Sequence, residues 1–122
     1  MKILIVDDSA VVRTVVRQAL VMAGYTDLIE AVDGVVALAI AKAEGASVGL
    51  YVLDVNMPNM DGITLVGELR KLDKTSPIIM LTTETDKAKM THAKELGATG
   101  WIVKPFDAEK FVGVVKLFMK KE

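Results

Sequence analysis

The feature that most constrains the fold is a regular alternation of short apolar runs with longer segments of helical periodicity. Each run is rich in Ile, Leu and Val without polar residues at alternate positions, which is typical of a buried parallel strand. The five runs cover residues 3–6, 28–32, 48–53, 77–81 and 100–103. The segments that follow them repeat apolar residues at helical spacing. The chain therefore predicts a βα unit repeated five times.

Capping and turn residues set the limits of the predicted helices. Ser9 caps the first helix, which ends at Ala23 before Gly24, and Asp107 caps the last, which runs to about Lys120. Three helices are predicted between these two. One covers residues 35–44 and another residues 86–96. The third follows the turn-rich loop 56–62 and ends at about Leu72.

Strands that are apolar on both faces and separated by helices predict a doubly wound α/β fold, with helices on both faces of a five-stranded parallel sheet. For five strands the favoured order is 2-1-3-4-5, the flavodoxin-like (βα)5 arrangement. The 122 residues suit one domain over positions 1–122.

Composition excludes several classes of protein. Hydrophobic residues make up 52% of the chain and charged residues 25%, which excludes a disordered tail. The net charge of −1 gives no basic excess for nucleic acid or an anionic membrane. The absence of cysteine excludes thiol chemistry, and no apolar run approaches the roughly 18 residues of a membrane span. We expect a cytoplasmic protein, monomeric or weakly dimeric, that binds neither nucleic acid nor membrane.

Polar side chains stand where the predicted strands end. Asp7 and Asp8 follow the first strand, Asp54 the third, Thr82 the fourth and Lys104 the fifth. In the order 2-1-3-4-5 the first and third strands are neighbours, and ligands of such sheets bind at the carboxyl ends beside that junction. We therefore expect three carboxylates to meet there, flanked by a hydroxyl and an ammonium.

Three clustered carboxylates repel one another, and a hard divalent cation relieves the repulsion. Ligands that are all oxygen favour Mg²⁺, with Mn²⁺ possible. A cation, a lysine and a hydroxyl around one carboxylate also suit a phosphoryl group. A simpler reading of Asp7 and Asp8 is favourable negative charge before a helix N-terminus.

These residues resemble a known family. Asp7-Asp8, Asp54, Thr82 and Lys104-Pro105, with the loop Met57-Pro58-Asn59-Met60-Asp61-Gly62, are similar to the receiver domain of two-component response regulators, in particular its single-domain, CheY-like members. The resemblance covers essentially the whole chain. It implies a signalling switch in chemotaxis or another phosphorelay, one that catalyses only its own phosphorylation and dephosphorylation.

The resemblance also implies residue roles. Asp54 is expected to accept a phosphoryl group from a histidine kinase or phosphotransfer protein. Four residues are expected to hold Mg²⁺. One is Asp54 itself; of the others, Asp8 would bind it directly, Asp7 through a water molecule and Asn56 through its backbone carbonyl. Thr82 is expected to supply the switch hydroxyl that bonds a phosphoryl oxygen, and Lys104 is expected to form an ion pair with the phosphoryl group. The Lys104-Pro105 peptide is expected to be cis.

Three further expectations concern the lifetime of the acyl phosphate and the surface that transmits the signal. Asn56 and Glu84, each two residues after a site residue, are expected to flank the path of the water that cleaves the acyl phosphate. Trp101 occupies the place where the family usually has a Tyr or Phe that moves inward with the switch Thr. A downstream protein is expected on the face of the helix over 86–96, the strand over 100–103 and the last helix. That helix directs Phe111, Val115, Phe118 and Met119 to the core and Leu117 away from it.

Two other classes of protein fit the same predicted fold. A Mg²⁺-dependent phosphohydrolase also uses an Asp nucleophile, but normally has a second acid two residues later, where this chain has Asn56. A flavodoxin-like cofactor-binding protein needs a loop rich in Ser, Thr and Gly after the first strand, where this chain has Asp7 and Asp8. No output domain fits in 122 residues, so we expect signalling by protein contact.

Overall fold

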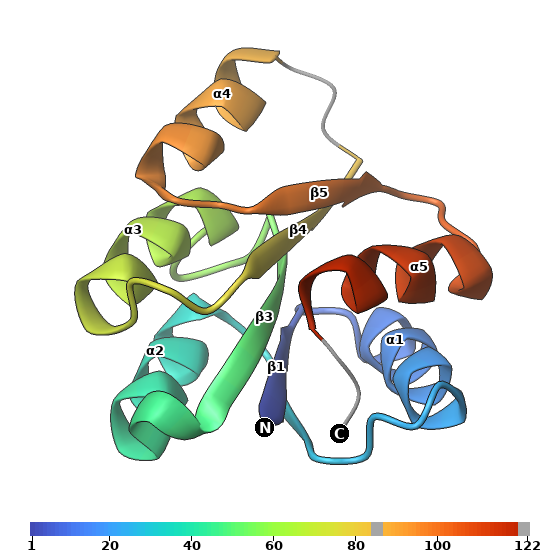
Figure 1. Cartoon of the computed structure of the whole chain (residues 1–122). Helices are drawn as coiled ribbons and strands as arrows, with labels where there is room; N and C mark the ends of the chain where they lie inside the picture. The colour runs from blue at the N-terminus through green and yellow to red at the C-terminus, as the bar shows by residue number, and fades with distance from the viewer. Residues whose placement is uncertain (84–86, 120–122) are drawn as a thin grey trace.

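The computed structural model describes residues 1–83 and 87–119 and confirms the predicted alternation (Figure 1). The strands are β1 (Lys2–Val6), β2 (Leu28–Ala31), β3 (Val48–Asp54), β4 (Ile78–Thr82) and β5 (Gly100–Val103). The helices are α1 (Ala10–Met22), α2 (Gly34–Glu44), α3 (Gly62–Leu72), α4 (Lys87–Leu96) and α5 (Ala108–Phe118), with a 3-10 turn, η1, over Gly45–Ser47.

The five strands form one parallel sheet in the order β2-β1-β3-β4-β5, as predicted. Helices α1 and α5 pack together on one face, and α2, α3 and α4 cover the other (Figure 1). Alternate strand residues enter two separate cores. One core contains Leu53 and Leu65, and the other contains Leu50 and Phe111.

Among the described residues, side-chain caps stand at the start of α1, α2, α3 and α5. Ser9, Asp33, Asp61 and Asp107 each accept a hydrogen bond from the backbone N–H three residues later, which satisfies a donor that has no partner within the helix. Because Asp33 caps α2, that helix begins at Gly34, one residue before the predicted start.

The last helix differs from its prediction. α5 ends at Phe118 because Met119 takes an extended conformation, and the Met119 carbonyl accepts a hydrogen bond of 2.9 Å from the hydroxyl of Tyr25. The predicted end at Lys120 lies outside the described residues. Phe111 and Val115 are buried and Leu117 is 78% exposed, as expected, but Phe118, which we placed in the core, is 37% exposed.

The other bounds agree with the predictions to within one residue, and the predicted first residue of α4, Asp86, lies outside the described residues. Within the residues described, no helix combines the length and the apolar character needed to cross a membrane.

Candidate functional site

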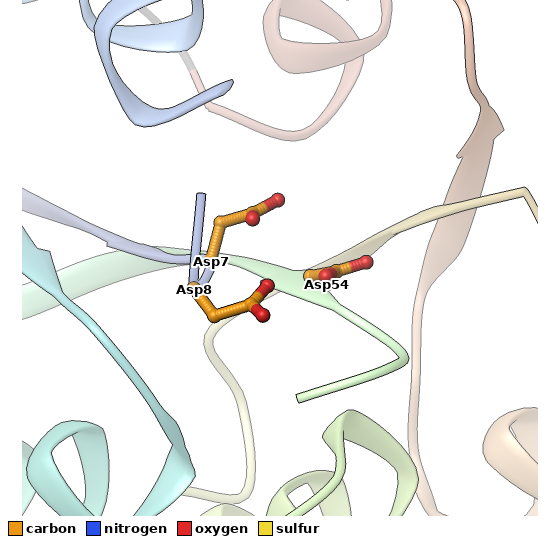
Figure 2. Close-up of side chains that lie close together, drawn as sticks. All are labelled: Asp7, Asp8 and Asp54. Atoms are coloured by element: carbon orange, nitrogen blue, oxygen red, sulfur yellow. The ribbon is translucent and has the colours of Figure 1, made fainter. Parts of the chain in front are cut away.

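Three carboxylates meet at the carboxyl ends of β1 and β3. Asp7 and Asp8 directly follow β1, and Asp54 is the last residue of β3. One oxygen from each carboxylate lies within 4.8 Å of the others, and Figure 2 shows the three side chains gathered at this edge of the sheet. Asp7 and Asp54 are buried, whereas Asp8 is exposed. This group is the carboxylate cluster that the strand order predicts.

Lys104 brings a positive charge to this carboxylate cluster. Its Nζ lies 3.1 Å from Asp7 Oδ2 and 3.1 Å from Asp54 Oδ1. The backbone N–H of Lys104 donates to the Thr82 carbonyl at 2.7 Å, which ties the end of β5 to β4. The Lys104-Pro105 peptide is cis, as the resemblance implies. Three carboxylates thus share one described ammonium and retain excess negative charge.

That excess charge changes the protonation equilibria. Burial raises the pKa of Asp54 above its ordinary value, and the nearby charges of Asp7 and Asp8 raise it further, against a smaller lowering by Lys104. For Lys104, burial by itself lowers the pKa, but the hydrogen bonds and charges of Asp7 and Asp54 outweigh burial and raise it. Lys104 is therefore held protonated, while the charged form of Asp54 is disfavoured without a further cation.

Backbone contacts hold the two buried aspartates in place. The Ser9 N–H donates to Asp7 Oδ1 at 2.8 Å, and the Arg13 guanidinium donates to the Asp7 carbonyl at 2.6 Å. After Asp54, the Val55 N–H donates to the Leu81 carbonyl at 3.2 Å, so the chain leaves β3 in a fixed direction.

Gly62, the last residue of the turn-rich loop, helps to position Asp54, a role that the turn residues do not predict. A Cβ atom at this position would overlap the backbone carbonyl of Asp54 and lie 3.0 Å from the Cα of Val55. The first turn of α3 can therefore approach the end of β3 only because residue 62 has no side chain. The signal in the sequence is the Asp61-Gly62 pair, in which a helix cap precedes the glycine.

The other predicted site residues that the structure describes lie on β4, on β5 and in the loop after β3. Thr82 is buried at the end of β4, and with Trp101 and Met90 it lines a small apolar cavity beneath α4. Trp101 is partly buried and packs against the core on the α4 side. Asn56 is exposed in the loop after Asp54 and lines a groove with Lys89 and His92. Glu84 lies outside the described residues.

The donor set fits a hard divalent cation. All three side-chain donors are carboxylate oxygens from two neighbouring strands, and their charge is only partly balanced by Lys104. The same cluster offers a carboxylate, Asp54, beside an ammonium, which is the arrangement that phosphoryl transfer requires.

Comparisons with known proteins point to one family. The family described as "Response regulator receiver domain" matches residues 3–116. The chemotaxis protein CheY1 of Helicobacter pylori is 42% identical over 108 residues, covering 87% of this chain and 86% of that protein. The structure of the CheX-CheY-BeF3-Mg²⁺ complex of Borrelia burgdorferi superposes with a TM-score of 0.91 at 31% identity, covering 98% of this chain and 90% of that one.

One relative is much longer than this chain. The probable transcriptional regulator ycf27 of Porphyridium aerugineum is 40% identical over 120 residues, which cover 98% of this chain but only 48% of that protein. The match to one family along most of the chain favours it over the phosphohydrolase and cofactor-binding alternatives.

Proposed function

This chain belongs to the response regulator receiver domain family and is homologous to CheY chemotaxis regulators, and on that premise we propose that Asp54 is its phosphoacceptor. One observation carries the proposal. Asp54 and Asp7 both contact Lys104 within the carboxylate cluster, but the other oxygen of Asp7 already accepts a hydrogen bond from the Ser9 N–H at 2.8 Å. The protein is thus a phosphorylation-activated signalling switch whose chemistry takes place at the end of β3.

The proposed reaction follows from these contacts. A carboxylate oxygen of Asp54 attacks the phosphorus of a phosphohistidine, the P–N bond breaks, and its electron pair stays on the imidazole nitrogen of the donor. The product on this chain is an acyl phosphate, which water later cleaves. Lys104 stays protonated and faces the incoming phosphoryl oxygens, where its charge stabilises the transition state. Such a domain catalyses only its own phosphorylation and dephosphorylation.

We propose that Asp7, Asp8, Asp54 and the backbone carbonyl of Asn56 hold Mg²⁺, or Mn²⁺, at this site. When bound, the cation supplies positive charge to the phosphoryl oxygens and balances the carboxylates. Titration of the protein with MgCl2, followed by amide chemical shifts, tests the site. Asp8→Ala is expected to abolish binding, while Asp27→Ala, an exposed residue paired with Lys2, is the control that keeps it. Unchanged affinity in Asp8→Ala contradicts the ligand set.

Thr82 and Trp101 are the proposed switch. Both line the cavity beneath α4, so a shift of the Thr82 side chain toward a phosphoryl group changes the packing around the indole ring. We propose that α4, β5 and α5 form the output face. Support comes from the exposure of Leu117 and from a groove of about 450 Å³ bordered by Trp101 and Leu117.

The proposed partners are a histidine kinase or phosphotransfer protein as donor and a downstream protein on the output face, in chemotaxis or another phosphorelay. The relative from Borrelia burgdorferi is in a complex with CheX, which supports protein contact as the output. Asn56 remains the proposed orienting residue for the water that cleaves the acyl phosphate, together with Glu84. Both the cytoplasmic location and the single-domain organisation of residues 1–122 stay predictions.

Intact-mass measurement after incubation with MgCl2 and acetyl phosphate tests the phosphoacceptor. The unmodified chain is expected to gain one phosphoryl group, and Asp54→Asn, whose amide has the same shape, is expected to gain none. Asp61→Asn, an exposed helix cap in the next loop, is the matched control that keeps the gain. A phosphoryl group on the Asp54→Asn variant contradicts the assignment.

A further inference from the structure

The loop over residues 55–61 joins the proposed phosphoacceptor to α3, and both of its ends are fixed. The Val55 N–H donates to the Leu81 carbonyl at 3.2 Å, and the Gly62 N–H donates back to the Val55 carbonyl at 2.8 Å. The chain between these points carries Asn56, whose backbone carbonyl is the proposed metal ligand. The position of that carbonyl therefore depends on what holds the middle of the loop.

The middle of the loop is tied to the start of α2. Asn59 Nδ2 donates to Asp33 Oδ2 at 2.8 Å, and the other oxygen of Asp33 accepts from the Val36 N–H at 2.9 Å. Asp33 is 8% exposed. The Val36 N–H and then the Asn59 amide lower the pKa of Asp33, so it accepts both bonds as a carboxylate. One side chain thus serves as a helix cap and as an anchor for the loop.

The backbone conformation at Asn59 and the absence of a side chain at Gly34 both allow this contact. Asn59 has φ 69°, a left-handed conformation that Asn tolerates better than most residues. A Cβ at Gly34 would lie 2.8 Å from the Met60 carbonyl oxygen and 2.8 Å from the Met60 Cβ. The absence of a side chain at residue 34 therefore lets the loop lie directly against the first turn of α2.

The residues that make this contact follow strands whose ends are bonded to, or carry, the proposed metal site. The Asp7 N–H donates to the Ala31 carbonyl at 3.2 Å, so the chain that leaves β1 runs beside the chain that leaves β2 and carries Asp33. Asp33 is two residues beyond Ala31, and Asn59 is three residues beyond Asn56. The hydrogen bond between Asn59 and Asp33 thus links the loop that supplies Asn56 to the segment after β2, and that segment lies beside the one that supplies Asp8.

We propose that Asp33 and Asn59 are positioning residues that set the Mg²⁺ affinity of this site by fixing the loop over 55–61, with the close approach of Gly34 and Met60 completing the contact. The inference rests on the proposed function, because it assumes that Asn56 supplies a carbonyl ligand. Groups that orient metal ligands typically change affinity by about 10- to 100-fold when removed.

Asn59→Gly is the first test, because glycine tolerates the left-handed backbone and removes the side chain that bonds Asp33. MgCl2 titration followed by amide chemical shifts is expected to give a dissociation constant about tenfold higher than that of the unmodified chain, with the urea midpoint nearly unchanged. Wild-type affinity in Asn59→Gly overturns the positioning role. An unmodified chain that binds no Mg²⁺ overturns the metal site itself and the positioning role with it, so the two failures are distinguishable.

An exchange of the two side chains provides a rescue. Asn59→Asp alone places two carboxylates against each other and is expected to weaken Mg²⁺ binding more than Asn59→Gly does. Adding Asp33→Asn restores one donor and one acceptor, with the same total charge, and is expected to recover most of the affinity. Failure of the double variant to bind more tightly than Asn59→Asp contradicts the proposed contact.

Gly34→Ala separates the contact from helix stability. Alanine favours the helix, but its Cβ would press on Met60, so Mg²⁺ affinity is expected to fall although no hydrogen-bonding group is lost. Gly113→Ala is the matched control, because a Cβ there meets no atom within 4 Å. Equal affinity in the two alanine variants would show that the loop does not depend on its approach to α2.

Discussion

The ammonium of Lys104 lies 3.1 Å from a carboxylate oxygen of Asp54, although the two residues are 50 positions apart in the chain. The same ammonium lies 3.1 Å from Asp7. Lys104 therefore bridges the carboxyl ends of β1 and β3 from the end of β5. This one contact joins three of the five strands at the edge of the sheet where we place the chemistry.

Lys104→Met is expected to slow phosphorylation without removing the acceptor. The methionine keeps much of the side chain's volume but leaves the buried carboxylates of Asp7 and Asp54 without this cation. The rate of phosphoryl gain from acetyl phosphate should fall by roughly 100-fold, the usual cost of losing one group that stabilises transition-state charge. Intact mass against time measures it, with Lys110→Met as an exposed control. An unchanged rate would exclude Lys104 from the transition state.

The pH dependence of stability is expected to report the carboxylate cluster. Burial and the neighbouring charges raise the pKa of Asp54 above 3.8, so as the pH rises the unfolded chain ionises this group first. Between 3.8 and the raised pKa the folded state holds more protons. The free energy of unfolding therefore falls as the pH rises through that window, and the loss persists above it.

Asp54→Asn removes this contribution, so without divalent cations the variant should be more stable than the unmodified chain at neutral pH. The difference should shrink toward about pH 4, where the unmodified carboxyl group is increasingly protonated. Urea unfolding curves at several pH values measure both effects. A stability difference that does not change with pH would contradict the raised pKa.

Gly62→Ala is expected to damage both the fold and the site. The new Cβ would overlap the Asp54 carbonyl, which is backbone and cannot rotate away. Overpacking of this kind typically costs about 1–3 kcal/mol, and relief of the overlap should displace Asp54. The urea concentration at the unfolding midpoint and the rate of phosphoryl gain should both decrease. Gly67→Ala is the control, since a Cβ there makes only ordinary contacts of 3.9 Å with Leu96.

Trp101 should report activation directly, because it is the only tryptophan in the chain. It shares a small cavity with Thr82 and Met90, so movement of Thr82 toward a bound phosphoryl mimic changes the environment of the indole. Beryllium fluoride with MgCl2 is expected to shift or quench its emission. Trp101→Ala should still gain a phosphoryl group but bind the downstream partner more weakly.

Identical Trp101 emission and identical hydrogen exchange in α4, with and without saturating beryllium fluoride, would mean that the signal leaves by another face. Asp54→Asn is the control for this measurement, because an emission change that persists without the acceptor carboxylate would arise from the salts and not from activation.

The position of the site could be predicted because it depends on local patterns. An apolar run with no polar alternation indicates a buried parallel strand, and the first polar residue after the run lies at its carboxyl end. Given the strand order, Asp7, Asp8, Asp54 and Lys104 had to meet at one edge. Thr82 follows the same logic, although the structure extends β4 to include it.

Contacts between distant elements could not be predicted in this way. The end of α5 depends on a hydrogen bond from Tyr25, 94 residues away from Met119, and the packing of Gly62 depends on the carbonyl of Asp54. Neither contact produces a periodic pattern in the sequence, because each depends on a single pair of atoms from segments far apart in the chain. The exposure of Phe118 has the same origin, since helical periodicity gives the direction of a side chain but not what lies there.

The sequence by itself thus determined the order and type of the elements, the strand ends that carry carboxylates, and the single ammonium that accompanies them, because spacing of 2 or 3.6 residues is written locally in the chain. The tertiary structure alone decided that Asp33 holds Asn59 at 2.8 Å and that burial, with the charges of Asp7 and Asp8, outweighs Lys104 and raises the pKa of Asp54. These properties depend on distances and solvent access between segments, which exist only once the elements have packed together.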